Sequence, residues 1–140
     1  KFCKKIFNKQ LNSKCMVLEE GMEFIKKFKT SLEHSAKNIG SGDVEVLSTP
    51  SLILFIENTA RELIDNSLGN EMISVGTIVD IKHIKASKIG DDVTIKVKLL
   101  TIDSNRYTFW AEAFSNGKRI AYGIHERAKV EKSKFLSSLK

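Results

Sequence analysis

Two segments of this sequence carry the side chains best suited to acid–base chemistry. Residues 48–64 read as an apolar helix that contains one carboxylate, Glu57. Residues 75–90 read as a strand that contains one imidazole, His83. Because a buried carboxylate and a buried imidazole each cost free energy to desolvate, both are candidates for chemistry. Thr49, just before the helix, adds a hydroxyl to this pair.

Together these three groups could activate a hydroxyl or position a water molecule, since nucleophilic catalysis commonly combines a hydroxyl, a histidine and a carboxylate. There is one geometric difficulty. Thr49 and Glu57 are eight residues apart, which in an ideal helix corresponds to roughly 12 Å. Either the helix begins after Thr49 and the chain folds back, or the residues act at separate points of one pocket, or the pocket draws on two chains.

Each candidate also has a purely structural explanation. Glu57 could lie at the edge of the apolar stripe and pair with Arg61, one turn further along the helix. His83 could be a satisfied core histidine, and Thr49 could serve only as a helix cap. A desolvated Glu57 that faces a pocket would instead suit a role as general base or as the carboxylate partner of another catalytic residue.

The strand of His83 contains a glycine with two interpretations. Gly76 stands seven residues before His83, and a glycine in a strand often marks the close approach of a ligand or another backbone. Its N–H could face a developing oxyanion, or Gly76 could simply begin the strand. On this strand Val79, Ile81 and His83 are predicted to face the helix, with Asp80 and Lys82 facing outward.

The helix itself is well specified by its sequence. Thr49 is a suitable N-cap, and Pro50 suits the first turn. Asn66 to Asn70, with Gly69, is predicted to end the helix. Apolar residues recur between these limits at three- and four-residue spacings, at Ile53, Ile56, Ala60, Leu63 and Ile64.

The other segments read as strands and turns. Residues 22–30 suit a strand, and residues 31–43 read as a polar loop. The clearest two-residue alternation covers residues 93–99, and Asn116-Gly117 is a strong hairpin signal. Further strands are predicted after the helix over residues 75–87, 107–114 and 118–130. The segment His125-Glu126-Arg127 is polar and could be only an exposed stretch of salt-bridged residues.

The order of these elements predicts an α+β fold. One strand and a long helix precede four strands whose short connecting turns imply antiparallel neighbours. A single helix cannot cover both faces of a sheet of about five strands, so the sheet is expected to curl around it. An edge or face is then left for a second chain, which predicts a homodimer.

The composition indicates one globular domain. The 140 residues are 41% hydrophobic and 29% charged, as is usual for a soluble fold. The longest apolar run, Leu52 to Ile56, is far too short to span a membrane. No secretory signal is recognised. No membrane partner is expected, and the predicted location is cytoplasmic.

The net charge of +6 is concentrated at the N-terminus. Residues 1–15 hold five lysines and no acidic residue, which leaves 18 basic and 17 acidic residues in the rest of the chain. We therefore predict a basic lead segment, either a disordered tail or a partner-binding arm, before a single domain over residues 16–140. No nucleic-acid partner is expected. Cys3 and Cys15 fit neither a zinc site nor a cytoplasmic disulfide, and no metal or cofactor is expected.

With these residues in view, the sequence resembles the fluoroacetyl-CoA thioesterase-like family of hot-dog fold proteins. The resemblance extends in element order over residues 20–135. The matching pieces are Thr49 with Glu57 eight residues later, Val75-Gly76-Thr77, His83, the turn at Gly90, and the segment YGIHERAKV from Tyr122 to Val130.

The resemblance implies a hot-dog fold and an acyl-CoA thioesterase with Thr49, Glu57 and His83 as catalytic residues. His83 would act as general base or orient water, with Glu57 as its partner or as the nucleophile. Gly76 would line the reaction centre. Lys82 and Lys85, followed by Lys88, could attract the phosphates of CoA, or they could be ordinary solvated lysines.

Two departures from the family pattern bear on the substrate. No Phe, Tyr or Trp occurs between Phe28 and Phe55, where the name-giving member has aromatic residues that close its pocket. Pro50 also stands where that member has a glycine. The expected substrate is therefore a short- or medium-chain acyl-CoA.

Two other functions are compatible with parts of this sequence. The first is a non-catalytic module that binds acyl-CoA as a ligand sensor, with the basic lead contacting a partner. The second is a hot-dog hydratase, which would need an aspartate five residues before His83, where Ile78 stands instead.

Overall fold

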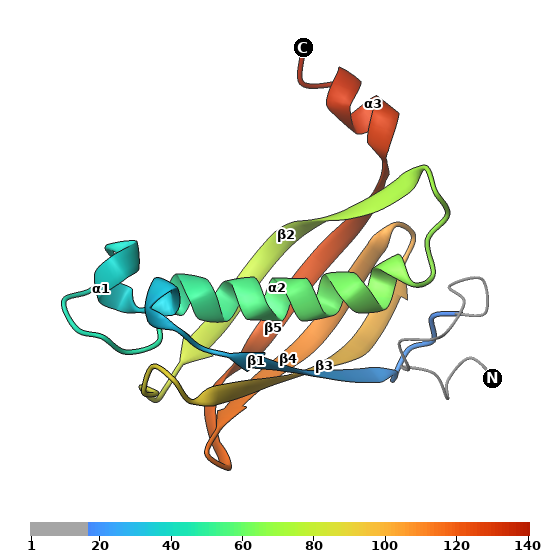
Figure 1. The fold of residues 1–140 in the computed structure, drawn as a ribbon. Coiled ribbons are helices and arrows are strands. Elements are labelled where there is room, and N and C mark those ends of the chain that lie inside the picture. The colour runs from blue at the N-terminus through green and yellow to red at the C-terminus, as the bar shows by residue number, and fades with distance from the viewer. Residues whose placement is uncertain (1–16) are drawn as a thin grey trace.

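The structure is a computed structural model that describes residues 17–140, so the predictions for residues 1–15 lie outside the described residues. Within these described residues, nine elements follow one another (Figure 1). They are β1 (Glu23–Lys29), a 3₁₀ helix (Leu32–His34), α1 (Ala36–Ile39), α2 (Thr49–Asp65), β2 (Met72–His83), β3 (Asp92–Asp103), β4 (Arg106–Ser115), β5 (Lys118–Glu131) and α3 (Lys132–Ser137). Among the described residues, no helix is long and apolar enough to cross a bilayer.

The five strands form one antiparallel sheet in the order β1-β3-β4-β5-β2. The sheet curves, and α2 lies across its inner face (Figure 1). This confirms the predicted α+β architecture of one long helix wrapped by an antiparallel sheet. Because β1 and β2 are the two edges, the strand that carries Gly76 and His83 has one side without a strand partner among residues 17–140.

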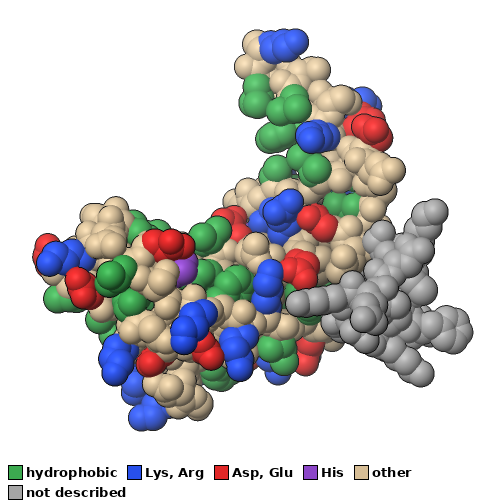
Figure 2. All heavy atoms as spheres, viewed as in Figure 1, with side chains coloured by type: hydrophobic (Ala, Val, Ile, Leu, Met, Phe, Trp, Pro, Cys, Tyr) green, Lys and Arg blue, Asp and Glu red, His purple; other side chains and the backbone are tan. Residues whose placement is uncertain are grey.

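The core lies between α2 and the sheet. One face of α2 is buried, and the alternate residues of β3 from Val93 to Leu99 lie opposite it, as the two-residue period predicts. Burying an aliphatic side chain of this size stabilises the fold by about 1.5–3 kcal/mol. On the outer surface, basic and acidic side chains are interspersed over the face drawn in Figure 2.

The cap of α2 differs from the prediction by one residue. Ser48, not Thr49, is the N-cap, and its Oγ accepts a hydrogen bond from the Ser51 N–H. The Ser48 N–H donates to the His34 carbonyl, and Leu47 beside it is buried, so tertiary contacts select the cap. Thr49 therefore lies in the first helical turn, with a hydroxyl that is not engaged in capping.

The segment predicted as a loop over residues 31–43 contains two short helices. The second, α1, is capped by Ser35, whose Oγ accepts from the Asn38 N–H. It ends at Gly40 in the left-handed conformation, with φ of 91°. Helices this short show no apolar period, so only their caps could have revealed them.

The edge strand β2 also departs from the simple alternation. It ends at His83 rather than at residue 87, and its pairing with β5 shifts register between Gly76 and Ile78. Ile81 packs against the core, but Val79 is 41% exposed, so the prediction that Val79 packs on the helix is wrong. Its place at an unpaired sheet edge accounts for this exposure.

Candidate functional site

Thr49 and His83 form a hydrogen-bonded pair. The chain runs along α2 and returns along β2, which brings the end of the strand beside the first turn of the helix (Figure 1). Thr49 Oγ1 lies 2.8 Å from His83 Nδ1. Because Ser48 takes the capping role, the Thr49 hydroxyl is available for this contact.

The environment of His83 keeps its imidazole neutral. Burial lowers the pKa of His83 below its usual 6.5, and a hydrogen bond with the backbone of Lys85 opposes this shift. The other ring nitrogen, Nε2, is buried and has no hydrogen-bond partner. A neutral imidazole next to a hydroxyl can accept a proton from that hydroxyl or from a bound water at neutral pH.

This pair opens into a pocket of about 350 Å³. The walls are the first turn of α2, the segment before it, and the residues that follow β2, including Ile84 and Lys85. The segment before α2 contributes small and aliphatic side chains such as Ala36, Val44 and Leu47. On the side where the sequence lacks Phe, Tyr and Trp, the pocket wall is therefore formed by small and aliphatic side chains.

Glu57 lies two turns further along α2, in a second group of residues. Its side chain is 37% exposed, and Oε2 lies 3.6 Å from Arg127 Nη1. A Cβ atom on Gly76 would overlap this carboxylate oxygen, so the glycine makes room for it. Arg61, the alternative partner considered for Glu57, pairs with Asp65 at 3.1 Å.

Arg127 is a residue that sequence reasoning missed. It is only 6% exposed, and Ser74 holds its guanidinium through Oγ at 2.9 Å and the carbonyl oxygen at 3.1 Å. The prediction that residues 125–127 are an exposed stretch is therefore wrong for Arg127 and for the fully buried His125. The alternation of β5 could have revealed this, since residues 125 and 127 share one face and Glu126 takes the other.

His125 contacts the Arg127 guanidinium and helps to fix its orientation. Its Nδ1 lies 2.8 Å from the Ile78 carbonyl, which accepts the ring N–H, and Nε2 then accepts from Arg127 Nη1 at 3.3 Å. Burial lowers the pKa of His125, and the Arg127 charge adds to that shift. The imidazole is thus neutral, and Arg127 keeps a positive charge beside Glu57 that could face an anionic or developing negative group.

The structure brings the candidate residues together as two groups. Thr49 contacts His83, and Glu57 contacts Gly76, but the two groups lie two helical turns apart, roughly 12 Å by helical rise. Since α2 already begins at Thr49, the alternative in which the chain folds back is excluded. Two alternatives remain. Either the two groups act at separate points of one pocket, or two chains together form the pocket. Lys85 lines the pocket of His83, while the exposed Lys82 does not.

The half-buried His83 and the buried His125 predict a loss of stability in acid. Both folded-state pKa values lie below the unfolded value of about 6.5, so the unfolded state binds more protons as the pH falls through this range. The stabilisation is fully present above pH 6.5 and is lost towards the lower folded pKa values. The free energy of unfolding should fall by at most about 1.4 kcal/mol per pH unit for each histidine.

Urea unfolding between pH 7.5 and 5 measures this slope. His125→Gln keeps a donor for Ile78 and an acceptor for Arg127 but cannot titrate, so its slope should be shallower than that of the wild type. Equal slopes for the two proteins would contradict the assignment of acid sensitivity to His125.

Comparison with known proteins adds to this geometry. The family model of the fluoroacetyl-CoA-specific thioesterase matches residues 31–133. A solved fluoroacetyl-CoA thioesterase is 21% identical with a TM-score of 0.83, over 89% of this chain and 96% of that chain. No curated protein matches the sequence.

Two further solved structures have similar folds. A hot-dog-like protein from Thermanaerovibrio acidaminovorans is 23% identical, with a TM-score of 0.80 over 87% of this chain and 90% of its own. A thioesterase superfamily member from Thermus thermophilus is 22% identical, with a TM-score of 0.81 over 88% and 91%. At these identities the likenesses establish the hot-dog fold.

Proposed function

We propose that this chain hydrolyses a short- or medium-chain acyl-CoA to the free acid and CoA. The chain belongs to the family of fluoroacetyl-CoA-specific thioesterases and is a thioester hydrolase. The observation that carries the proposal is the 2.8 Å contact between Thr49 Oγ1 and a neutral His83 at an open pocket. Among the similar solved structures, one is a complex with fluoroacetate and CoA and another a complex with acetyl-CoA.

In the proposed reaction His83 acts as the base. It removes a proton from the Thr49 hydroxyl or from a water held beside it, and the resulting oxygen nucleophile attacks the thioester carbonyl. The carbon–sulfur bond breaks, and the imidazolium returns its proton to the departing CoA thiolate. Attack by Thr49 would leave an acyl ester that a second water must hydrolyse, whereas attack by water yields the acid directly.

We further propose that the complete site is shared between two subunits of a homodimer. The midpoint of Gly76 and His83 along β2 falls at Val79 and Asp80. If two β2 strands pair antiparallel about a two-fold axis at this midpoint, Gly76 lies opposite His83 of the partner subunit. Glu57, which contacts Gly76, then approaches that same histidine and joins the two groups in one site.

The exposed edge of β2 supports this arrangement. Ile78 and Val79 are 46% and 41% exposed on an edge strand whose outer side has no strand partner in the described part of the chain. An apolar unpaired edge is a surface that folded proteins usually cover. The other edge, β1, carries Lys26, Lys27 and Lys29, which makes it a poor surface for strand pairing.

The polar group around Glu57 favours the short end of this substrate range. In the shared site the acyl group would approach the Glu57 carboxylate and the Arg127 guanidinium. A long alkyl chain placed there would desolvate charged groups without replacing their hydrogen bonds. Small acyl groups avoid this cost.

A panel of acyl-CoA substrates, from acetyl to dodecanoyl, tests the proposal when the released thiol is measured. We expect kcat/KM to be highest for short chains and to decline with chain length. Absence of turnover with every acyl-CoA would overturn the proposal. Binding of CoA esters without turnover would then favour the ligand-sensing alternative.

A further inference from the structure

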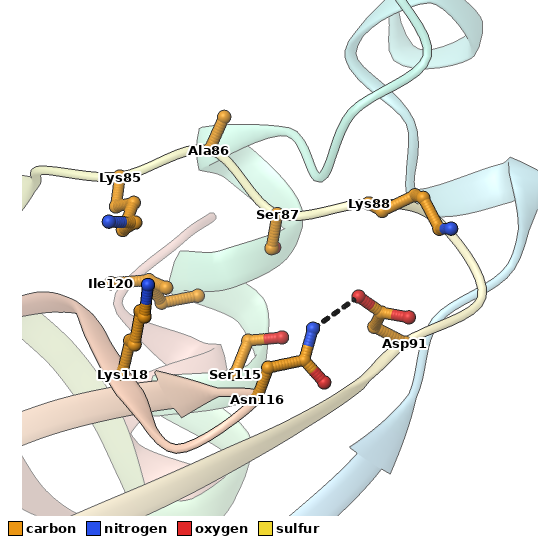
Figure 3. Close-up of a pocket in the computed structure, with 9 residues that line it drawn as sticks. All are labelled: Lys85, Ala86, Ser87, Lys88, Asp91, Ser115, Asn116, Lys118 and Ile120. Atoms are coloured by element: carbon orange, nitrogen blue, oxygen red, sulfur yellow. Dashed lines mark hydrogen bonds between the residues drawn. The ribbon is translucent and has the colours of Figure 1, made fainter.

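A second pocket lies next to the candidate site, between the connection of β2 to β3 and the hairpin of β4 and β5 (Figure 3). Its volume is about 330 Å³. Three lysines line it, Lys85 and Lys88 from the connection and Lys118 from the first residue of β5. The pocket therefore joins segments far apart in the sequence around a basic rim.

Ser87 gives this pocket an unsatisfied donor. The residue is only 8% exposed, and its Oγ is buried without a hydrogen-bond partner. Figure 3 places Ser87 on one wall of the pocket, between Ala86 and Lys88 and across from Ser115 of the hairpin. An unpaired buried hydroxyl is costly, and rotation of the Ser87 side chain to another rotamer would let it donate to an oxygen of a ligand bound in this pocket.

The charge of the pocket favours an anion. Within the described residues, the ammonium groups of Lys85, Lys88 and Lys118 take part in no ion pair. The one carboxylate of the lining, Asp91, accepts a hydrogen bond from Asn116 Nδ2 at 2.9 Å. Lys85 and Lys118 lie on the same side of the pocket, with Lys88 at the opposite end beyond Ser87 (Figure 3). Free ammonium groups around a hydroxyl donor suit phosphate oxygens.

This pocket is also adjacent to the pocket of Thr49 and His83. Lys85 and Ala86 line both pockets. Five residues lead from His83 to Lys88, a chain length of at most about 17 Å when extended. A CoA thioester has its reactive carbonyl at one end and its phosphates at the other, joined by a flexible arm. Such a molecule can follow this connection from one pocket to the next.

We propose that the pocket between the β2–β3 connection and the β4–β5 hairpin binds the phosphate groups of the CoA portion of the substrate. Lys85 and Lys118 supply the positive charge at one side, and the Ser87 hydroxyl donates to a phosphate oxygen. The proposal rests on the proposed thioesterase function. Of the two lysines that the sequence predicts to attract the CoA phosphates, Lys85 lines this pocket. Lys82 lines neither pocket, and Lys118 takes the role predicted for it.

The kinetic test compares substrates with and without phosphates. In Lys118→Ala the KM for acetyl-CoA should rise by about 10-fold, with kcat unchanged, because one charge-assisted contact is lost. With acetyl-pantetheine, which has no such phosphates, the variant and the wild type should be equal. Lys98→Ala removes an exposed lysine of β3 outside the pocket and should leave both KM values unchanged.

An unchanged KM for acetyl-CoA in Lys118→Ala would overturn the proposal. An equal rise of KM for acetyl-pantetheine would also overturn it, since the lysine would then act on the fold or on the other pocket. Competition with ADP distinguishes a pocket that binds the phosphates of CoA from a pocket that binds a separate nucleotide. ADP should inhibit acetyl-CoA turnover competitively and more weakly in Lys118→Ala, whereas ADP binding without competition would assign the pocket to a separate nucleotide and overturn the proposal.

Calorimetric binding of free CoA separates this proposal from the proposed function. Weaker CoA binding by Lys118→Glu, with Lys98→Glu unaffected, supports the pocket even if no acyl-CoA is hydrolysed. Equal CoA binding by Lys118→Glu and the wild type overturns the pocket even if hydrolysis is observed.

Discussion

Replacing His83 with alanine is expected to lower kcat/KM for acyl-CoA hydrolysis by about 100- to 10,000-fold, the usual contribution of a positioned general base. The imidazole lies 2.8 Å from the Thr49 hydroxyl, and burial keeps it neutral by lowering its pKa. Its loss removes the proton acceptor that both routes of attack require. Steady-state kinetics with the best acyl-CoA of the panel measures the effect.

Several controls make this result specific to His83. Circular dichroism and thermal unfolding should show that the variant keeps its fold, since His83 is half-buried at the end of an edge strand. In the wild type, kcat/KM should fall on the acid side with an apparent pKa below 6.5, as the lowered pKa of His83 requires. Turnover that is unchanged in His83→Ala would remove His83 from the mechanism.

Thr49→Ala distinguishes the two routes that share this base. If the Thr49 hydroxyl attacks, intact-protein mass spectrometry of briefly reacted enzyme should show an acyl adduct that Thr49→Ala lacks. If water attacks, the wild type should show no adduct, and Thr49→Ala should keep more activity than His83→Ala.

A heterodimer of two inactive chains should recover about half of the wild-type activity, because one of its two sites would be intact. One chain carries Thr49→Ala and the other carries Glu57→Gln. Each variant alone is expected to lose activity by about 100-fold or more, as is usual when one member of a catalytic group is removed. In the mixed dimer, the native Glu57 and the native Thr49 meet in one site across the interface, provided that β2 pairs with the β2 of the partner.

Two affinity tags, one on each chain, allow the mixed dimer to be purified after co-expression. The matched control places both substitutions on one chain and pairs it with a wild-type chain. A site shared between subunits makes this control inactive and the first heterodimer active, whereas a site within each chain gives the reverse pattern. A chain that is monomeric in solution would contradict the shared site outright.

The elements that position the site were accessible from local sequence patterns. The apolar spacing from Ile53 to Ile64 and the alternation of residues 93–99 predict helix and strand because each pattern matches the repeat of one backbone geometry. Turn residues such as Asn116 and Gly117 separate the strands. Short connections and one helix then restrict the fold to a sheet that curls around the helix.

The candidate site was only partly accessible in this way. Glu57 and His83 attract notice as polar side chains on faces that are otherwise apolar, and Gly76 as a glycine within a strand. Arg127 was missed because an arginine in a polar run is usually exposed. Its burial depends on two residues that bind its guanidinium, Ser74 of β2 and His125. The Ile78 carbonyl in turn fixes the ring of His125.

The sequence by itself determined which elements form and in what order, since helix, strand and turn preferences act over a few neighbouring residues. Only the tertiary structure decided that Ser48 caps α2 and that Thr49 consequently meets His83. It also separated this pair from Glu57 and Gly76, and it assembled the basic pocket around Ser87 from two distant turns. These contacts depend on strand register and on the path of the helix across the sheet, and long-range packing sets both.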